Sequence, residues 1–230
     1  MKLVGRWVKR GLLILIGLIL FYQLWLLAHI FYWKSFNPGS TSFMLIQLNT
    51  LREKNPRAEL KHRWVPYEKI SIHLKRAVVA SEDDRFMQHN GLDWTGIQYA
   101  LKKNQRKGAA VAGGSTITQQ LAKNLFLTPS RSYIRKGQEA VITLMIEALW
   151  DKRRILEVYL NVAEWGSGVF GAEAAARHYF HVSAANLSRR QAAHIAVMLP
   201  NPREFERSYP DYVSRHSYRV QARMHRSQVP

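Results

Sequence analysis

The sequence has no cysteine, and it has only 16 acidic residues against 34 lysines and arginines, which gives a formal net charge of +18 in 230 residues. The lack of cysteine excludes a disulfide scaffold, a cysteine-ligated zinc site and a thiol nucleophile. With 47% hydrophobic and 11% aromatic residues, the chain is not disordered and is long enough for one domain with a core. The positive charge points to a polyanionic partner, namely nucleic acid, an anionic membrane surface or a phosphorylated substrate.

Several catalytic motifs are also missing. The chain contains no H-E-x-x-H, no G-x-x-x-x-G-K-[ST], and no serine that begins S-x-x-K. These absences exclude, in turn, a zinc protease of the H-E-x-x-H type, a P-loop nucleotide site and the transpeptidase site of a penicillin-binding protein. The nine histidines show no spacing typical of metal ligands and are interpreted as structural.

Residues 11–33 contain no lysine, arginine, aspartate or glutamate. A bilayer core about 30 Å thick needs about 20 apolar helical residues, and this run is longer than the roughly 7–15 apolar residues of a signal peptide. We therefore expect an uncleaved transmembrane helix rather than a cleaved signal or a buried core helix. All the charged residues before the run are basic. This places the N-terminal tail, residues 1–10, in the cytoplasm and the rest of the chain on the other side of the membrane. These basic residues are Lys2, Arg6, Lys9 and Arg10.

The remainder of the chain is predicted to be mainly helical. Residues 34–65 are interpreted as a polar, irregular connector, and residues 66–202 as the catalytic domain, because apolar residues recur there with helical spacing and no period-2 strand is visible. Residues 102–114 are predicted to form a basic and then glycine- and alanine-rich loop. The basic segment 203–230 is predicted to be a solvated or membrane-facing helix. Further helices are expected at 95–103, from a cap at Ser115 to 124, from 128–130 to 150, around 155–160, at 172–179 and from a capping box at Ser188 to 199.

Three consecutive acidic residues, Glu82, Asp83 and Asp84, stand out in so basic a chain. Glu82 directly follows an apolar helical face, so it is expected where a helix ends near the core. Partial burial there would raise the pKa of its carboxyl group toward the range of a general base. The plain alternative is a solvated acidic helix end.

A second constellation follows Gly113 and Gly114. On a helix, Thr116, Gln120, Lys123 and Asn124 form one polar stripe. A helix start after two glycines presents backbone N–H groups to an anion, and Lys123 adds a positive charge. An ordinary amphipathic helix is the alternative.

A third constellation is Arg135-Lys136 with Glu139. Arg135 and Glu139 are four residues apart and can pair on one helix face, as an ordinary surface ion pair would. Lys152, Arg153 and Arg154 extend this basic surface. Together with Lys123, these cations can form a clamp for a pyrophosphate group.

These motifs, in this order, resemble those of the monofunctional biosynthetic peptidoglycan glycosyltransferases, or transglycosylases. The same family forms the polymerase domain of bifunctional penicillin-binding proteins. The resemblance covers about residues 66–202, and the membrane anchor also stands where the family has it. The matching segments are Glu82-Asp83-x-x-Phe86-x-x-His89-x-Gly91, Gly113 to Leu121 with Lys123-Asn124, Arg135-Lys136-x-x-Glu139, Lys152-x-x-Ile155-Leu156-Glu157-x-Tyr159-Leu160-Asn161, and Gly168-x-x-Gly171 with Ala174-Ala175 and Tyr179-Phe180.

The resemblance implies a lysozyme-like helical domain with a small membrane-proximal jaw, preceded by one transmembrane helix. It implies polymerisation of lipid II, a disaccharide-pentapeptide on undecaprenyl pyrophosphate, with inversion at the anomeric carbon. The implied location is the bacterial inner membrane, with the catalytic domain in the periplasm. The implied partners are lipid II, the nascent glycan strand, the membrane and proteins of cell-wall synthesis, and nucleic acid is not among them.

The resemblance also implies roles for individual residues. Glu82 is the expected general base, and Glu139, the second family glutamate, is expected to orient the cationic groups and the donor. No cofactor is required, although divalent cations such as Mg or Mn stimulate some family members, and Asp83 is expected to assist either Glu82 or such a cation. No metal-ligand spacing is visible. The expected substrate-binding residues are Asp83, Ser115, Thr116, Gln120, Lys123, Asn124, Arg135 and Lys136.

Two other classes compete with this interpretation. A lytic hydrolase of the same fold would use one glutamate as a general acid, but its uncharged substrate would not need the cations at Lys123 and Arg135. A non-enzymatic basic membrane protein would bind nucleic acid or anionic lipid. The acidic cluster at Glu82 and the polar stripe that contains Gln120 argue against that class.

Overall fold

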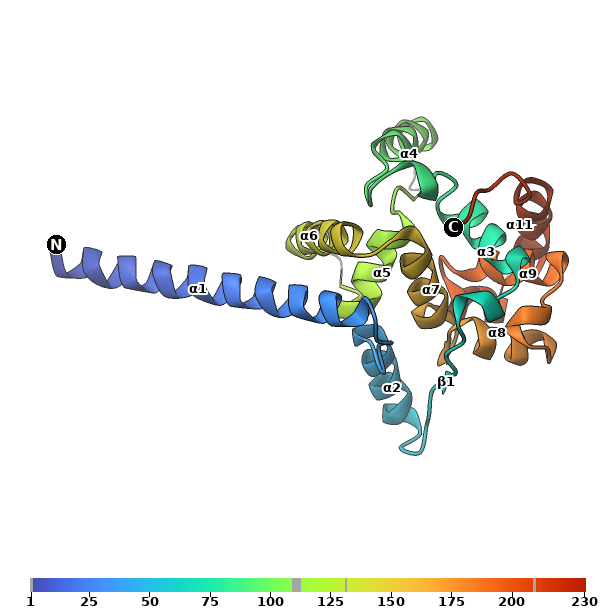
Figure 1. Cartoon of the computed structure of the whole chain (residues 1–230), viewed down its shortest axis with the longest axis horizontal. Helices are drawn as coiled ribbons and strands as arrows, with labels where there is room; N and C mark the ends of the chain where they lie inside the picture. The colour runs from blue at the N-terminus through green and yellow to red at the C-terminus, as the bar shows by residue number, and fades with distance from the viewer. Residues whose placement is uncertain (1, 109–112, 131, 209) are drawn as a thin grey trace. The chain divides into compact units, whose positions relative to one another are not determined.

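The computed structural model describes residues 2–108, 113–130, 132–208 and 210–230, and the chain divides into two compact units, Met1–Pro38 and Gly39–Pro230 (Figure 1). The elements in chain order are α1 (Lys2–Trp33), α2 (Ser42–Lys54), β1 (Lys61–His62), α3 (Ile72–Glu82), α4 (Trp94–Lys107), α5 (Ile117–Phe126), α6 (Tyr133–Leu149), α7 (Lys152–Val162), β2 (Glu164–Gly166), β3 (Val169–Phe170), α8 (Ala172–Phe180), α9 (Arg189–Met198), α10 (Pro202–Ser208) and α11 (Pro210–Arg223), with short 3-10 turns at Tyr67–Lys69, Phe86–Gln88 and Ala184–Asn186.

The first unit consists mainly of the long helix α1. Its segment Lys9–Trp33 has 25 residues and a mean hydropathy of 2.3, which is long and apolar enough to cross a membrane. Large apolar side chains along it are exposed, with Leu13 at 67% and Phe21 at 70%. A helix in the core of a soluble protein would bury such side chains. The single predicted transmembrane helix is therefore supported by the structure.

The second unit is built from packed helices, so the predicted mainly helical fold is confirmed. In Figure 1, α3 lies beside α9 and α11, and α5 lies beside α6 and α7. The apolar stripes that predicted these helices face one another, and Leu74, Leu121, Ile155 and Ile195 are fully buried. Burial of such aliphatic side chains is the main stabilising term of a helical domain of this size.

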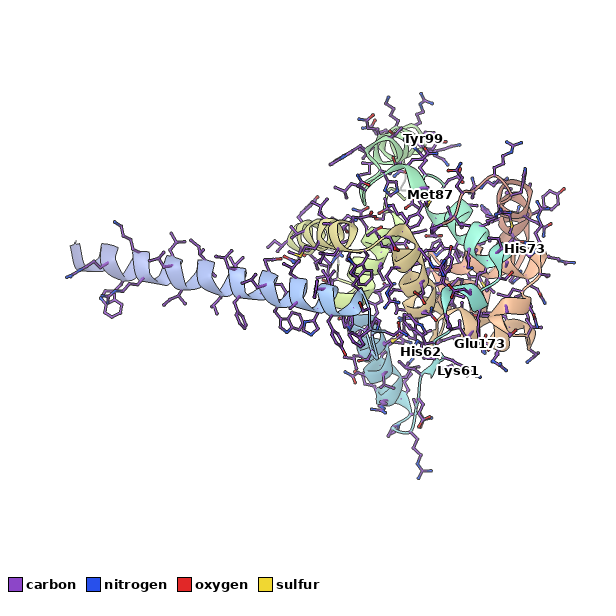
Figure 2. The ribbon with its side chains drawn as sticks, in the orientation of Figure 1. Lys61, His62, His73, Met87, Tyr99 and Glu173 are labelled. Carbon is purple, nitrogen blue, oxygen red and sulfur yellow. The ribbon has the colours of Figure 1, made fainter. Side chains whose placement is uncertain are left out.

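A small three-stranded sheet, which the sequence pattern does not reveal, lies beside these helices. Its order is β1-β3-β2, with β1 parallel and β2 antiparallel to β3. Figure 2 shows Lys61 and His62 of β1 close to α8, which carries Glu173. Strands of two or three residues are too short to show a period-2 pattern, which explains why they were not predicted.

Two residues tie this sheet to α7. The side chain of Asn161 is fully buried, and it accepts a hydrogen bond from the Val65 backbone N–H and donates one to the Val65 carbonyl, each at 2.9 Å. Gly171, with φ +85°, precedes α8, and a Cβ atom at this position would lie 2.6 Å from the backbone oxygen of Asn161. Only glycine combines this conformation with so close an approach.

Two of the predicted loops are partly helical. The irregular connector expected at 34–65 contains α2, whose first turn is capped by the Thr41 side chain, an acceptor for the Met44 N–H at 3.2 Å. The loop expected at 102–114 begins later, because α4 continues to Lys107. Part of that predicted loop, residues 109–112, lies outside the described residues.

The predicted helix starts are close to the observed ones. The capping box at Ser188 is confirmed, with Gln191 as its partner. The prediction of Ser115 as the cap of the next helix was wrong by one residue, because the cap of α5 is Thr116, which forms a capping box with Gln119. A serine and a threonine in sequence are equally good caps, and only the backbone angles decide between them.

We predict that Gly171→Ala lowers the free energy of unfolding by about 2–4 kcal/mol. Alanine would have to keep a positive φ, which strains its backbone, and its Cβ atom would clash with the backbone of Asn161. Thermal unfolding of the purified chain measures this loss. The control is Gly137→Ala at an exposed position in the N-terminal part of α6, where a Cβ would meet nothing within 4 Å. That variant should gain about 0.5–1 kcal/mol from helix propensity, and equal stabilities of the two variants would contradict the close-approach argument.

Candidate active site

Glu82, the last residue of α3, lies between two adjoining cavities. The first cavity, of about 380 Å³, is lined by Glu82 together with residues of α5 and α6. The second, of about 490 Å³, is lined by Glu82 together with residues of α4 and the segment before α5. The half-buried carboxyl group therefore reaches both spaces, as a group that acts between two bound molecules must.

The protonation of Glu82 is governed by opposing effects. Burial raises the pKa of its carboxyl group, and the neighbouring charge of Asp83 raises it further. Hydrogen bonds from Gln120 Nε2 to Oε2 at 2.8 Å and from Ser81 Oγ to Oε1 at 3.3 Å lower it, as does the charge of Lys123. Burial is the largest effect, so the net direction is upward, toward the range in which a carboxylate accepts a proton from a hydroxyl group.

Asp83, expected to bind substrate and to assist Glu82 or a cation, borders the second cavity and is also engaged within the fold. Its Oδ2 accepts the backbone N–H of Ile117, the first residue of α5, at 3.0 Å, and its Oδ1 accepts Nε2–H of His89 at 2.9 Å. Nδ1 of His89 accepts the Gly91 N–H at 3.1 Å, so the imidazole is a neutral tautomer with its proton on Nε2. Asp83 thus joins the end of α3 to the start of α5.

Cationic groups gather on the α6 side of the first cavity. Arg135 donates to Glu139 Oε2 at 2.6 Å, and Lys136 pairs with Oε1 of the same carboxylate and donates to Ser115 Oγ at 3.0 Å. The carboxylate of Glu139 is buried. Because both of its oxygens are occupied by cations, it can orient Arg135 and Lys136 but is poorly placed to take a proton from substrate.

Arg135 retains an unused donor. Within the described chain, its buried Nε atom has no hydrogen-bond partner. A buried donor without a partner costs about 1–3 kcal/mol, and such a group in a folded protein calls for an explanation. Its position on a residue that lines the first cavity fits a site in which a bound anion accepts this hydrogen bond.

Lys123 contributes a further cation to the same cavity. It lies on α5, and its Nζ atom is 5.2 Å from the centroid of the Phe43 ring on α2. Burial lowers the pKa of its ammonium group, and so do Arg135 and Lys136, whereas Glu139 and Glu82 oppose this effect. A cation held in such surroundings gains strongly from a bound polyanion.

The other members of the predicted polar stripe differ from one another. Gln120 lines the first cavity, as does Ser115, which precedes the stripe. Thr116 borders the second cavity, but its hydroxyl donates to the Gly91 carbonyl at 2.6 Å and also caps α5. Asn124 is buried and does not line either of these cavities. Of the four stripe residues, two therefore line the first cavity, one caps α5 and one is buried, namely Gln120 and Lys123, Thr116, and Asn124.

The three cations at the start of α7 do not join the cavity, so the prediction that they extend the clamp was wrong. Each of them forms an ion pair with a glutamate that does not line the first cavity. The ion pairs are Lys152 with Glu147 at 2.8 Å, Arg154 with Glu157 at 2.9 Å, and Arg153 with Glu68.

Residues to which the sequence analysis gave no role in the site also shape it. Tyr159 on α7 donates to Gln120 Oε1 at 2.9 Å. Leu199 and Pro200 border the first cavity, and Arg223 of α11 borders the second. Arg223 lies in the basic segment 203–230, and a basic pattern alone does not distinguish it from its solvated neighbours.

The described residues contain no group of three or more histidine, aspartate or glutamate side chains arranged to hold a metal ion. Asp83, the residue suggested for a divalent cation, has both oxygens engaged by Ile117 and His89.

Comparison with known proteins agrees with this geometry. Residues 48–225 match the model of the transglycosylase family. A biosynthetic peptidoglycan transglycosylase of Azoarcus sp. strain BH72 is 61% identical over 230 residues, and one of Aromatoleum aromaticum is 59% identical over 230 residues, each covering 100% of both chains. The protein of the same name from Dechloromonas aromatica is 60% identical over 231 residues.

We predict that Asp83→Ala lowers the free energy of unfolding by about 2–4 kcal/mol, because it leaves a buried N–H of α5 and the His89 ring without their acceptor. Denaturant unfolding followed by circular dichroism measures this loss. The neighbouring exposed Asp84, whose Oδ1 accepts Ser227 Oγ at 2.8 Å, provides the matched variant Asp84→Ala, expected to lose about 1 kcal/mol or less. An Asp83→Ala protein as stable as Asp84→Ala would refute the structural role.

Proposed function

The chain belongs to the transglycosylase family, and on that premise we propose that it is a peptidoglycan glycosyltransferase that polymerises glycan chains from lipid II. The observation that carries the proposal is the position of Glu82. Its carboxyl group has a raised pKa and lies between a cavity lined with cations and a second, adjoining cavity. That arrangement suits a reaction between a donor that carries an anionic leaving group and an acceptor that must lose a proton.

In the proposed reaction, Glu82 is the general base. It takes the proton from the 4-hydroxyl of the acceptor sugar in the second cavity as that oxygen attacks C1 of the lipid-linked sugar of the growing chain. The bond from C1 to the α-linked undecaprenyl pyrophosphate breaks, and the pyrophosphate leaves with the bonding electron pair. A β-1,4 bond forms, so the anomeric centre is inverted, and the proton remains on Glu82 until solvent removes it.

The first cavity is the proposed site of the departing pyrophosphate. Charge builds up on the leaving group as the bond to C1 breaks, and cations held nearby in advance stabilise that charge. Lys123 and Arg135 are the proposed ligands, because the first is half-buried beside the cavity and the Nε donor of the second has no partner among the described residues. Lys136 and Ser115, which already contact each other at 3.0 Å, complete the cationic wall.

Glu139 is proposed to be a positioning residue. Its carboxylate holds Arg135 and Lys136 on one face of α6. Without this carboxylate, the two cations would repel each other and lose the orientation that suits a pyrophosphate. The role fits a carboxyl group that is buried and occupied, whereas a second proton acceptor would need a free oxygen.

A membrane location follows from the same substrate. The apolar helix α1 fits an anchor in the inner membrane, where a lipid-linked substrate resides. The basic residues before the span favour a cytoplasmic N-terminus, and the catalytic unit would then lie in the periplasm. Lipid II, the nascent strand and the membrane are the proposed partners, with proteins of cell-wall synthesis as further candidates.

A lytic hydrolase is the second candidate, because a glutamate with a raised pKa also suits a general acid. Its glycosidic substrate has no anionic leaving group, and the cations at Lys123 and Arg135 would have no role. Incubation with lipid II separates the two: glycan polymer supports the proposal, and cleaved cell wall without polymer supports the hydrolase.

We predict that Glu82→Gln lowers the polymerisation rate by at least about a hundredfold, the usual contribution of a general base, while the fold is retained. Turnover of labelled lipid II to polymer measures the rate, and circular dichroism checks the fold. The control is Glu59→Gln at an exposed position, which should polymerise at the normal rate. Near-normal turnover by Glu82→Gln would remove Glu82 as the base.

We predict that Lys123→Ala lowers kcat/KM for lipid II by about tenfold or more, because a cation that stabilises the departing pyrophosphate is lost. Steady-state kinetics at fixed ionic strength measures the effect, with the exposed Lys69→Ala as a control for the loss of one positive charge. If the two variants have equal kinetics, Lys123 does not belong to the pyrophosphate site.

A further inference from the structure

A chain of hydrogen bonds connects Tyr159 to the proposed base through Gln120. The hydroxyl of Tyr159 on α7 donates to Oε1 of Gln120 on α5 at 2.9 Å, and Nε2 of Gln120 donates to Oε2 of Glu82 on α3 at 2.8 Å. Tyr159 is 1% exposed, whereas Gln120 and Glu82 border the first cavity. One fully buried hydroxyl group is thus linked to a carboxyl group at the cavity.

The direction of each hydrogen bond follows from the chemistry of its ends. An ionised carboxylate can only accept, so the amide of Gln120 must turn its NH₂ group toward Glu82. The amide oxygen then faces Tyr159, whose hydroxyl must donate. Burial, together with the charges of Glu82 and Asp83, raises the pKa of Tyr159 well above its ordinary value, so the hydroxyl keeps its proton.

The orientation of the Gln120 amide decides its effect on Glu82. With NH₂ toward the carboxylate, the hydrogen bond stabilises the charged form and opposes the effect of burial. With the amide rotated by half a turn, the amide oxygen would face the carboxylate and favour the protonated form. Tyr159 opposes the rotated state, because its buried hydroxyl would then face the NH₂ group and its O–H would lose the acceptor that the amide oxygen supplies.

We propose that Tyr159 is a positioning residue for the general base, which it keeps in its proton-accepting form by fixing the orientation of the Gln120 amide. This inference rests on the proposed function, because it concerns the proton acceptor of that reaction. Tyr159 itself lines neither of the two cavities that Glu82 borders, and it transfers no proton in the proposed reaction. The role differs from that of Gln120, which borders the substrate space.

Other charged groups also face Glu82, and they are the same in the native chain and in a variant at Tyr159. Asp83 raises the pKa of Glu82 and Lys123 lowers it. The groups on α6 across the first cavity are Arg135, Lys136 and Glu139, and those that border the second cavity are Asp84, Arg85, Asp93 and Arg223. A variant that lacks only the Tyr159 hydroxyl therefore shows the effect of the Gln120 amide on Glu82, because these charges do not change.

The test is the pH dependence of kcat/KM for lipid II polymerisation by Tyr159→Phe in the full-length chain. The acid limb of the profile should move upward by about one pH unit, so that the rate on that limb falls about tenfold, and the rate at the alkaline end should approach the native value. The matched control is Tyr179→Phe, which removes a hydroxyl that donates to the Trp165 carbonyl at 2.8 Å, and its profile should not move.

A double-variant cycle supplies a second readout. Gln120→Ala removes the amide and should also raise the acid limb, and addition of Tyr159→Phe to it should cause little further change, because the two act through one hydrogen-bond chain. Additive losses would overturn the proposal. So would a folded Tyr159→Phe protein with an unmoved acid limb, or one that loses rate equally at every pH.

The native chain is assayed first, so that a failure of the proposed function can be told apart from a failure of the proposed role of Tyr159. A native chain that makes no polymer from lipid II refutes both the proposed function and this inference. A native chain that polymerises, with an unchanged profile for Tyr159→Phe, refutes the inference alone. If thermal unfolding shows that Tyr159→Phe does not fold, Gln120→Ala takes its place, and an unmoved acid limb in that variant overturns the proposal.

Discussion

The carboxylate of Asp83 is the interaction on which the geometry of the site depends. The first N–H groups of a helix have no partner within that helix, and Asp83, at the end of α3, accepts such an N–H at the start of α5, from Ile117. The two helix ends are thereby held together. Gln120 then lies one turn along α5 beside Glu82, and Lys123 lies a turn further on, at the same cavity. The proposed base and the proposed pyrophosphate ligand are placed by one structural carboxylate.

The large positive charge of the chain divides into parts with different physical roles. Some cations are used within the fold, as in the pairs of Lys152 with Glu147 and Arg154 with Glu157, and these neutralise buried or half-buried acidic groups. Others lie at the first cavity, where Lys123 is half-buried and Arg135 Nε has no hydrogen-bond partner among the described residues. The net charge counts both kinds of cation equally. For this reason, composition alone could not decide whether the partner is nucleic acid, a membrane surface or a phosphorylated substrate. The proposed pyrophosphate site rests on the position of these cations relative to Glu82 and not on the total charge.

The parts of the site that could be predicted are those set by short-range spacing. The pair of Arg135 and Glu139 follows from four residues of helix, and the end of α3 at Glu82 follows from the apolar face before it. The contact of Tyr159 with Gln120 spans 39 residues, and no local pattern encodes such a contact. Helix α2 was missed because four of its apolar residues are consecutive, at 43–46, and so give little helical periodicity, although Thr41 is an ordinary cap. The role of Asp83 was missed because a capping acceptor distant in sequence looks the same as a catalytic acid.

The C-terminal segment, which lies beyond the motifs found in residues 66–202, also contacts the end of α3. The final carbonyl groups of a helix lack partners within it, and the Ala80 carbonyl near the end of α3 accepts a hydrogen bond from Arg223 of α11 at 2.7 Å. A guanidinium group is also the favoured charge at a helix C-terminus. Ser227 adds a hydrogen bond to Asp84 at 2.8 Å. The end of α3 is thus held on one side by α5 through Asp83 and on the other by the C-terminal segment. The motif identifies Glu82, but residues more than a hundred positions away fix where its carboxyl group lies, so the catalytic unit extends physically beyond the segment that carries its motifs.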